Sequence, residues 1–164
     1  VPELVRQIRD HVGAPHNTHL HFGATSQDII DTSLVLRLRE CIKIYRSRIG
    51  ELLTLLETQK NQFENHVLVG RTRMQAAKQI TVANKIENWA EPLRTSLERL
   101  GELEPRLLVL QFGGPVGTLD ELGENAKEVS AFLAADLKLN NPDKSWHTDR
   151  SNIAEFASWL SPVT

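Results

Sequence analysis

The sequence has few of the groups that cross-link a protein or carry it across a membrane. Its single cysteine, Cys41, excludes an internal disulfide and a cysteine-based zinc site. No apolar run approaches the ~20 residues that a membrane helix needs, and no secretory signal is visible. The 19 basic and 21 acidic residues give a net charge of −2. We therefore expect a cytoplasmic protein that binds neither nucleic acid nor a membrane surface.

Proline is missing from residues 27–64, and glycine occurs there only at Gly50. Apolar residues in this stretch recur at steps of three and four, which predicts one very long helix. Such a helix needs packing partners along its whole length, so we predict an all-α fold built as a long-helix bundle or a helical oligomer. Further helices are predicted over residues 2–12, 74–110, 119–137 and 152–160, with Trp89 in the core.

The most informative polar stretch is HFGATSQDIIDT, residues 21–32. Thr25 and Ser26 lie where the long helix should begin, and free N–H groups at a helix N-terminus favour an anion. The alternative is an ordinary helix cap, with Ser26 as N-cap and Asp28 in the first turn. The two uses are compatible.

A second polar cluster lies in HVLVGRTRMQAA, residues 66–77, where we place the start of the next long helix. Its two guanidinium groups, hydroxyl and amide can bind a carboxylate or a phosphate, although exposed surface arginines would give the same pattern. The residues are Arg71, Thr72, Arg73 and Gln75.

Three histidines, His16, His19 and His21, lie close together, but no acidic residue lies among them. We therefore predict no metal site. Residues 111–118, QFGGPVGT, break the helical pattern without the spacing of a phosphate-binding loop.

The stretches at residues 21–32, 70–77 and 111–118 together resemble signatures of the fumarase/aspartase superfamily, in the same order and with similar spacing. Within it, the chain is most similar to the 3-carboxy-cis,cis-muconate cycloisomerase branch. The discriminating residue is Arg73, since fumarases and adenylosuccinate lyases usually carry a proton-transferring histidine there. Arginine stays protonated near neutral pH and cannot shuttle a proton.

The resemblance implies a polycarboxylate substrate such as 3-carboxy-cis,cis-muconate, no cofactor, and lactonisation through donors that stabilise growing negative charge. It places His21, Thr25 and Ser26 at one carboxylate and the cluster at residues 71–75 at another. Arg150 is a weaker candidate, because the family's Gln-Arg-Asp-Arg run is Asp-Arg-Ser-Asn here.

The resemblance also implies a homotetramer in which residues 1–24 end an N-terminal domain and residues 25–164 begin the central helical domain. The family's serine loop, which carries the catalytic base, has no counterpart in the sequence, and the chain begins with Val1 rather than methionine. We therefore expect part of a longer enzyme, inactive alone, with no certain catalytic residue. The alternatives are an adenylosuccinate lyase-like enzyme and a truncated, non-catalytic oligomerisation scaffold.

Overall fold

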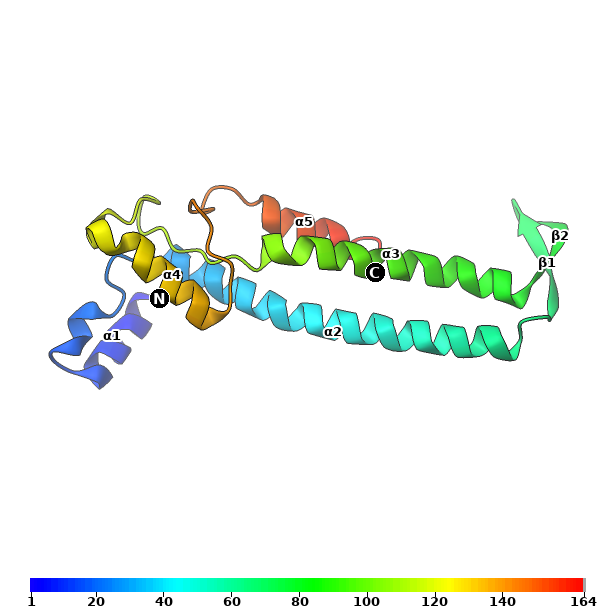
Figure 1. Ribbon diagram of the computed structural model, residues 1–164, viewed down its shortest axis with the longest axis horizontal. Coiled ribbons are helices and arrows are strands. Elements are labelled where there is room, and N and C mark those ends of the chain that lie inside the picture. Colours follow the sequence, from blue (N-terminus) through cyan, green and yellow to red (C-terminus); the bar gives the residue numbers. More distant parts are fainter. Residues whose placement is uncertain (164) are drawn as a thin grey trace. The chain divides into compact units, whose positions relative to one another are not determined.

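The computed structural model describes residues 1–163, and these residues are predominantly helical (Figure 1). The α-helices are α1 (Pro2–Val12), α2 (Ser26–Gln62), α3 (Val82–Leu107), α4 (Ala126–Leu137) and α5 (Ser151–Leu160). Short 3₁₀ helices, η1 (His16–His19) and η2 (Asp120–Asn125), precede α2 and α4. The all-α prediction is therefore confirmed, and no helix within residues 1–163 is long and apolar enough to cross a membrane.

The predicted helix over residues 74–110 begins eight residues too early. Residues 67–81 instead form an antiparallel hairpin, with β1 (Val67–Thr72) paired to β2 (Gln75–Thr81). Good helix formers such as Gln75, Ala76 and Ala77 favoured the wrong prediction. The turn carries no Asn-Gly or Asp-Gly signal, since Arg73 and Met74 themselves adopt positive φ angles of 44° and 65°.

The predicted helix over residues 119–137 is split in two. Gly123, inside η2, has a φ of 53° and a ψ of −131°, which interrupts the helical backbone before α4 begins. Glycine inside a helical pattern was the available signal for this break. The last predicted helix, over residues 152–160, agrees with α5.

The chain forms two compact units, to which α2, α3 and α5 each contribute residues. Unit 1 comprises Val1–Glu40 and Leu103–Phe156. Its core packs the start of α2 against the chain after α3 and against α4, and its buried members are Val35, Val109, Leu110, Ala134, Leu139 and Trp146.

Unit 2 comprises Cys41–Glu102 and Ala157–Thr164. Within it, segments of α2 and α3 run side by side and the hairpin joins them (Figure 1). Trp159 is buried there: its indole N–H donates to the Ser96 carbonyl at 2.8 Å, and its ring meets the Tyr45 ring edge-on at 5.4 Å. Trp89, predicted as core, is instead 53% exposed with Lys85 Nζ over its ring.

Candidate functional site

Thr25 and Ser26 lie at the start of α2, as the sequence predicts. The helix begins at Ser26, so Thr25 rather than Ser26 takes the N-cap position, which corrects the predicted cap. Both residues are partly exposed, and within residues 1–163 neither hydroxyl has a hydrogen-bond partner. The two hydroxyls and the positive end of a 37-residue helix therefore remain available to an anion.

Asp28, one turn further along α2, is only 2% exposed and accepts four hydrogen bonds. Oδ2 accepts from the backbone N–H groups of Thr25 and Gly114, both at 2.9 Å. Oδ1 accepts from the Gly113 N–H at 3.0 Å and from Gln111 Nε2 at 3.1 Å. The bond to Thr25 is the helix cap, and the other three attach the helix start to the glycine-rich segment.

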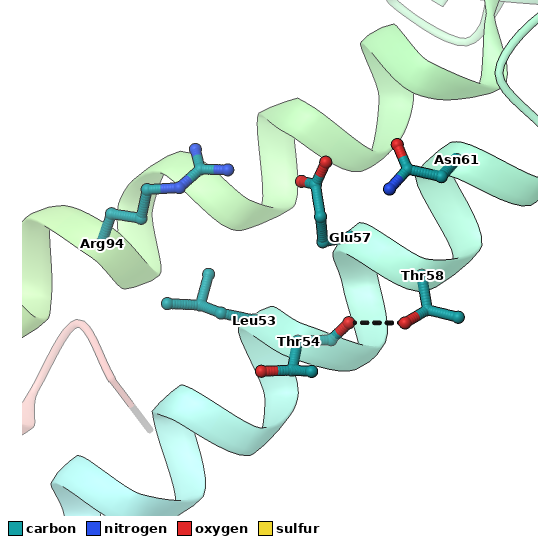
Figure 2. Close-up of a pocket in the computed structure, with 6 residues that line it drawn as sticks. All are labelled: Leu53, Thr54, Glu57, Thr58, Asn61 and Arg94. Atoms are coloured by element: carbon teal, nitrogen blue, oxygen red, sulfur yellow. Dashed lines mark hydrogen bonds between the residues drawn. The ribbon is translucent and has the colours of Figure 1, made fainter.

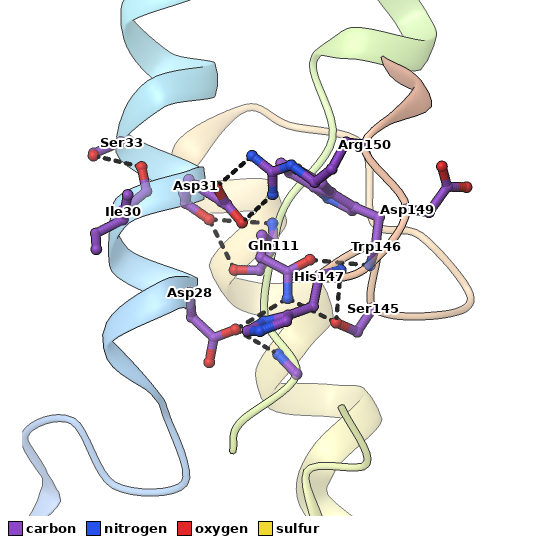
Figure 3. Close-up of polar contacts among 12 residues, drawn as sticks. Asp28, Ile30, Asp31, Ser33, Gln111, Ser145, Trp146, His147, Asp149 and Arg150 are labelled. Carbon is purple, nitrogen blue, oxygen red and sulfur yellow. Dashed lines mark hydrogen bonds and ion pairs between the residues drawn. The ribbon is translucent and has the colours of Figure 1, made fainter. Parts of the chain in front are cut away.

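Gln111 is the second centre of this buried network and is 1% exposed. Its Nε2 also donates to Ser145 Oγ at 2.7 Å, while its Oε1 accepts from the Trp146 N–H at 3.0 Å. Its backbone carbonyl accepts from Thr32 Oγ1 at 2.8 Å. The residue thus joins α2 to the segment that precedes α5, as Figure 3 shows.

A fork-shaped ion pair links the same two elements. Arg150 donates from Nη1 and Nη2 to Asp31 at 2.7 and 3.0 Å, and its guanidinium lies 5.2 Å from the Trp146 ring centroid (Figure 3). Burial by itself would raise the pKa of Asp31, but hydrogen bonds from Arg150 and Gln27, with the charges of Arg150 and His147, lower that pKa overall. Two N–H groups of Arg150 are thus engaged by Asp31, and a substrate contact from this side chain stays a prediction.

Glycines allow these segments to approach closely. A Cβ at Gly113 would lie 2.6 Å from Ser145 Oγ, and one at Gly114 would lie 2.7 Å from the Gly23 carbonyl. Both distances are shorter than a carbon atom tolerates. The loop before α2, the glycine-rich turn and the segment before α5 therefore pack against one another almost without intervening side chains.

The arginine cluster lies on the hairpin rather than at a helix start. Arg73 is at the turn, Arg71 and Thr72 end β1, and Gln75 begins β2. All four are exposed, and residues 67–81 contain three cationic side chains and no acidic one. The structure thus brings the four residues together in unit 2, while His21, Thr25, Ser26 and Arg150 lie in unit 1.

His21 has a φ of 60° in the loop before α2 and is partly buried. Its Nε2 is shielded from solvent and lacks a hydrogen-bond partner within residues 1–163. In the same described range, no three His, Cys, Asp or Glu side chains are grouped as a metal site requires.

Each unit has a hollow lined by polar groups. In unit 1, the glycine-rich segment, the start of α4 and residues 141–148 line a groove of about 1360 Å³ that includes Ser145 and His147. In unit 2, a shallow hollow between α2 and α3 is lined by Glu57 and Arg94 (Figure 2). The groove in unit 1 reaches the buried network through Ser145. In the hollow of unit 2, Arg94 is paired with Glu87 and Glu91.

Sequence reasoning missed Gln111 and Ser145 altogether and saw in Asp28 only a first-turn acid. A glutamine two residues before a glycine pair was the available signal, because it begins a segment too rich in glycine for a helix. Its partners lie 34 and 83 residues away, which no local pattern reveals.

Comparisons with known proteins agree with the three sequence signatures. Residues 3–164 match the family model described as Lyase. The chain is 43% identical over 145 residues to a 3-carboxy-cis,cis-muconate cycloisomerase from Pseudomonas aeruginosa, which covers 88% of the chain and 32% of that protein. It is 36% identical over 164 residues to an adenylosuccinate lyase from Methanothermobacter thermautotrophicus, covering 99% of the chain and 36% of that protein.

Among solved structures, the chain is similar to the 3-carboxy-cis,cis-muconate lactonizing enzyme from Pseudomonas putida. The TM-score is 0.92 at 42% sequence identity, covering 98% of this chain and 37% of that one. The chain thus spans about a third of the length of the curated relatives it matches.

Proposed function

Since the chain belongs to this lyase family, and through it to the fumarase/aspartase superfamily, we propose that it supplies carboxylate-binding walls to an enzyme that lactonises 3-carboxy-cis,cis-muconate. In this reaction a substrate carboxylate adds across a double bond to give a muconolactone. The observation that carries the proposal is 43% identity to a cycloisomerase, combined with hydroxyls at the start of α2 that have no partner within residues 1–163.

One wall is the start of α2. Thr25 and Ser26 offer hydroxyls and the helix its free N–H groups, which together suit a carboxylate that gains negative charge during reaction. His21 lies in the same loop. Arg150 is bonded to Asp31 of α2 and adds positive charge to this wall.

The other wall is the hairpin. Arg71, Thr72, Arg73 and Gln75 offer guanidinium, hydroxyl and amide donors, and no carboxylate within residues 67–81 competes for them. The arginine at position 73 favours binding over proton transfer, because its guanidinium does not deprotonate near neutral pH.

The test is a chimera in which the aligned 145 residues of the Pseudomonas aeruginosa relative are replaced by those of this chain. We expect the chimera to lactonise 3-carboxy-cis,cis-muconate, as measured by loss of diene absorbance. Its kcat/KM should lie within about tenfold of the parent enzyme's, a difference of about 1.4 kcal/mol in activation free energy.

In the chimera, Ser26→Ala should lower kcat/KM about 100-fold through loss of one transition-state donor. Ser33→Ala is the matched control, because among the described residues this exposed hydroxyl bonds only the Ile30 carbonyl of the same helix. A chimera without lactonisation would contradict the proposal.

An adenylosuccinate lyase-like activity is the second candidate, and 36% identity to such an enzyme over 164 residues favours it. Assaying the same chimera with adenylosuccinate separates the two. Cleavage of adenylosuccinate without lactonisation would select the alternative, and activity toward neither substrate would favour the non-catalytic scaffold.

We further propose that the whole enzyme is a cytoplasmic homotetramer and that the 164-residue chain alone has no substantial turnover.

A further inference from the structure

We infer that Asp28 and Gln111 are a pair of positioning residues that hold the start of α2 in register with the Gly113–Gly114 turn, so that Thr25 and Ser26 are set for a carboxylate before it binds. The carboxylate in this inference rests on the proposed function. The positioning itself rests on contacts within unit 1.

The first step is that Asp28 does more than cap a helix. A cap needs one bond, which Thr25 provides. The three remaining bonds all go to residues 111–114, more than 80 residues away in the sequence.

The second step concerns which side chain can make these bonds. All four partners of Asp28 are N–H donors, so each carboxylate oxygen accepts twice. An asparagine of the same shape would keep one accepting oxygen and turn an NH₂ group toward two donors. Only an ionised carboxylate satisfies the whole set at this size.

The third step is that Gln111 connects Asp28 to residues 145–146. Its amide orientation is fixed, because Nε2 faces two acceptors and Oε1 faces the Trp146 N–H. Ser145, one of those acceptors, lines the groove of unit 1. The carboxylate of Asp28 and the amide of Gln111 therefore connect the helix start, the glycine turn and the groove wall.

The consequence is a preorganised helix start. Oδ2 of Asp28 accepts from Thr25 and Gly114 together, so displacement of either segment breaks the same acceptor site. Donors that are already in place lose little orientational freedom on binding, which raises affinity.

The first experiment uses NMR on the unmodified chain. Couplings across hydrogen bonds should connect the amide nitrogens of Thr25, Gly113 and Gly114 to the Asp28 side-chain carboxyl carbon. Absence of these couplings in well-resolved spectra would overturn the inference without any variant.

The second experiment compares Asp28→Asn with Asp136→Asn, an equal change at an exposed position of α4. Amide exchange at Thr25, Gly113 and Gly114 should accelerate at least about tenfold in Asp28→Asn, since opening becomes easier by roughly 1.4 kcal/mol. It should be unchanged in Asp136→Asn. Unchanged exchange in both variants would overturn the inference.

The third experiment separates positioning from stability. Titration with 3-carboxy-cis,cis-muconate, followed by the amide shifts of Thr25 and Ser26, should give about tenfold weaker binding to folded Asp28→Asn than to the unmodified chain or Asp136→Asn. Equal affinities would overturn the positioning role. If the unmodified chain bound no carboxylate, the proposed function of this wall would fall, whereas the couplings would still decide the role of Asp28.

Discussion

Three neighbouring polar residues of α2 shape unit 1, because Asp28, Asp31 and Thr32 are all buried where the helix meets other segments. Buried polar groups are stable only when their hydrogen bonds are made. Here each of the three side chains bonds to a segment distant in sequence, so their burial favours only packings that bring these segments together.

Gln111→Leu should destabilise the chain by about 2–3 kcal/mol. The leucine has a similar volume, but it removes the hydrogen bonds to Asp28 and Ser145 and the acceptor of the buried Trp146 N–H. Chemical denaturation measures the change. Gln59→Leu, at an exposed position of α2, is the matched control and should stay within about 0.5 kcal/mol.

The ion pair between Asp31 and Arg150 predicts a pH dependence. The pKa of Asp31 is lower in the folded chain than its ordinary 3.8, so the pair stabilises the fold above about pH 4. This contribution is lost as the pH falls through the lowered folded pKa, since the carboxyl is then protonated in both states.

Asp31→Asn should therefore lower the free energy of unfolding by about 2 kcal/mol at pH 7 and by progressively less below pH 4. Denaturation at several pH values measures the difference between the two chains. A difference that stayed constant down to pH 2 would show that Asp31 does not contribute through its charge.

At the scale of elements, two turns depend on unusual backbone. The Gly113–Gly114 turn packs so closely that even a methyl group meets Ser145 or the Gly23 carbonyl. The hairpin turn instead places two non-glycine residues at positive φ. The glycine turn is therefore constrained by packing. The hairpin turn places the Arg73 guanidinium at its tip, and the positive φ angles there lower its stability.

Gly113→Ala should destabilise the chain by at least about 2 kcal/mol, because the new Cβ would lie 2.6 Å from Ser145 Oγ. Gly50→Ala is the matched control. Apart from the adjoining backbone of α2, no heavy atom of residues 1–163 lies within 4 Å of a Cβ there, and alanine in the middle of α2 should stabilise by about 0.5–1 kcal/mol. Thermal or chemical unfolding distinguishes the opposite signs, and similar effects of both changes would contradict the close packing.

Met74→Gly should stabilise the hairpin by about 1 kcal/mol, since the residue is 92% exposed and its φ is 65°. Amide exchange of β1 and β2 should slow accordingly. Because Arg73 is retained, the charge at the turn does not change. Faster exchange would mean that the Met74 side chain, rather than its backbone, supports the turn.

At the scale of the whole molecule, α2 exposes large apolar side chains within unit 2. Ile44, Leu52 and Leu55 are 60%, 44% and 63% exposed. Rows of such residues on a helix favour association, in agreement with the proposed homo-oligomer.

We therefore predict that the chain self-associates in sedimentation experiments, and that Ile44→Gln with Leu55→Gln shifts it toward monomer by about tenfold or more in dissociation constant. Leu4→Gln, an exposed apolar position of α1 in unit 1, is the control and should leave the association unchanged. A monodisperse monomer of the unmodified chain would contradict this prediction.

The sequence by itself determined the helical fold class, the extent of α2 and α5, and the family. These follow from local causes: apolar spacing over residues 27–64, missing proline, and short signatures such as the one that contains Thr25 and Ser26. The hairpin was not predicted because its turn lacks the usual residues and β2 is rich in helix formers.

Only the tertiary structure decided the roles of Asp28, Gln111 and Arg150. In the sequence they are an acid in a first turn, a glutamine before two glycines and an arginine in an altered motif. Their bonds join positions separated by up to 119 residues, and such pairings depend on how the elements pack rather than on local preference. The sequence thus located the start of α2 as the predicted anion site, while the packing around Asp28 determined how that start is held.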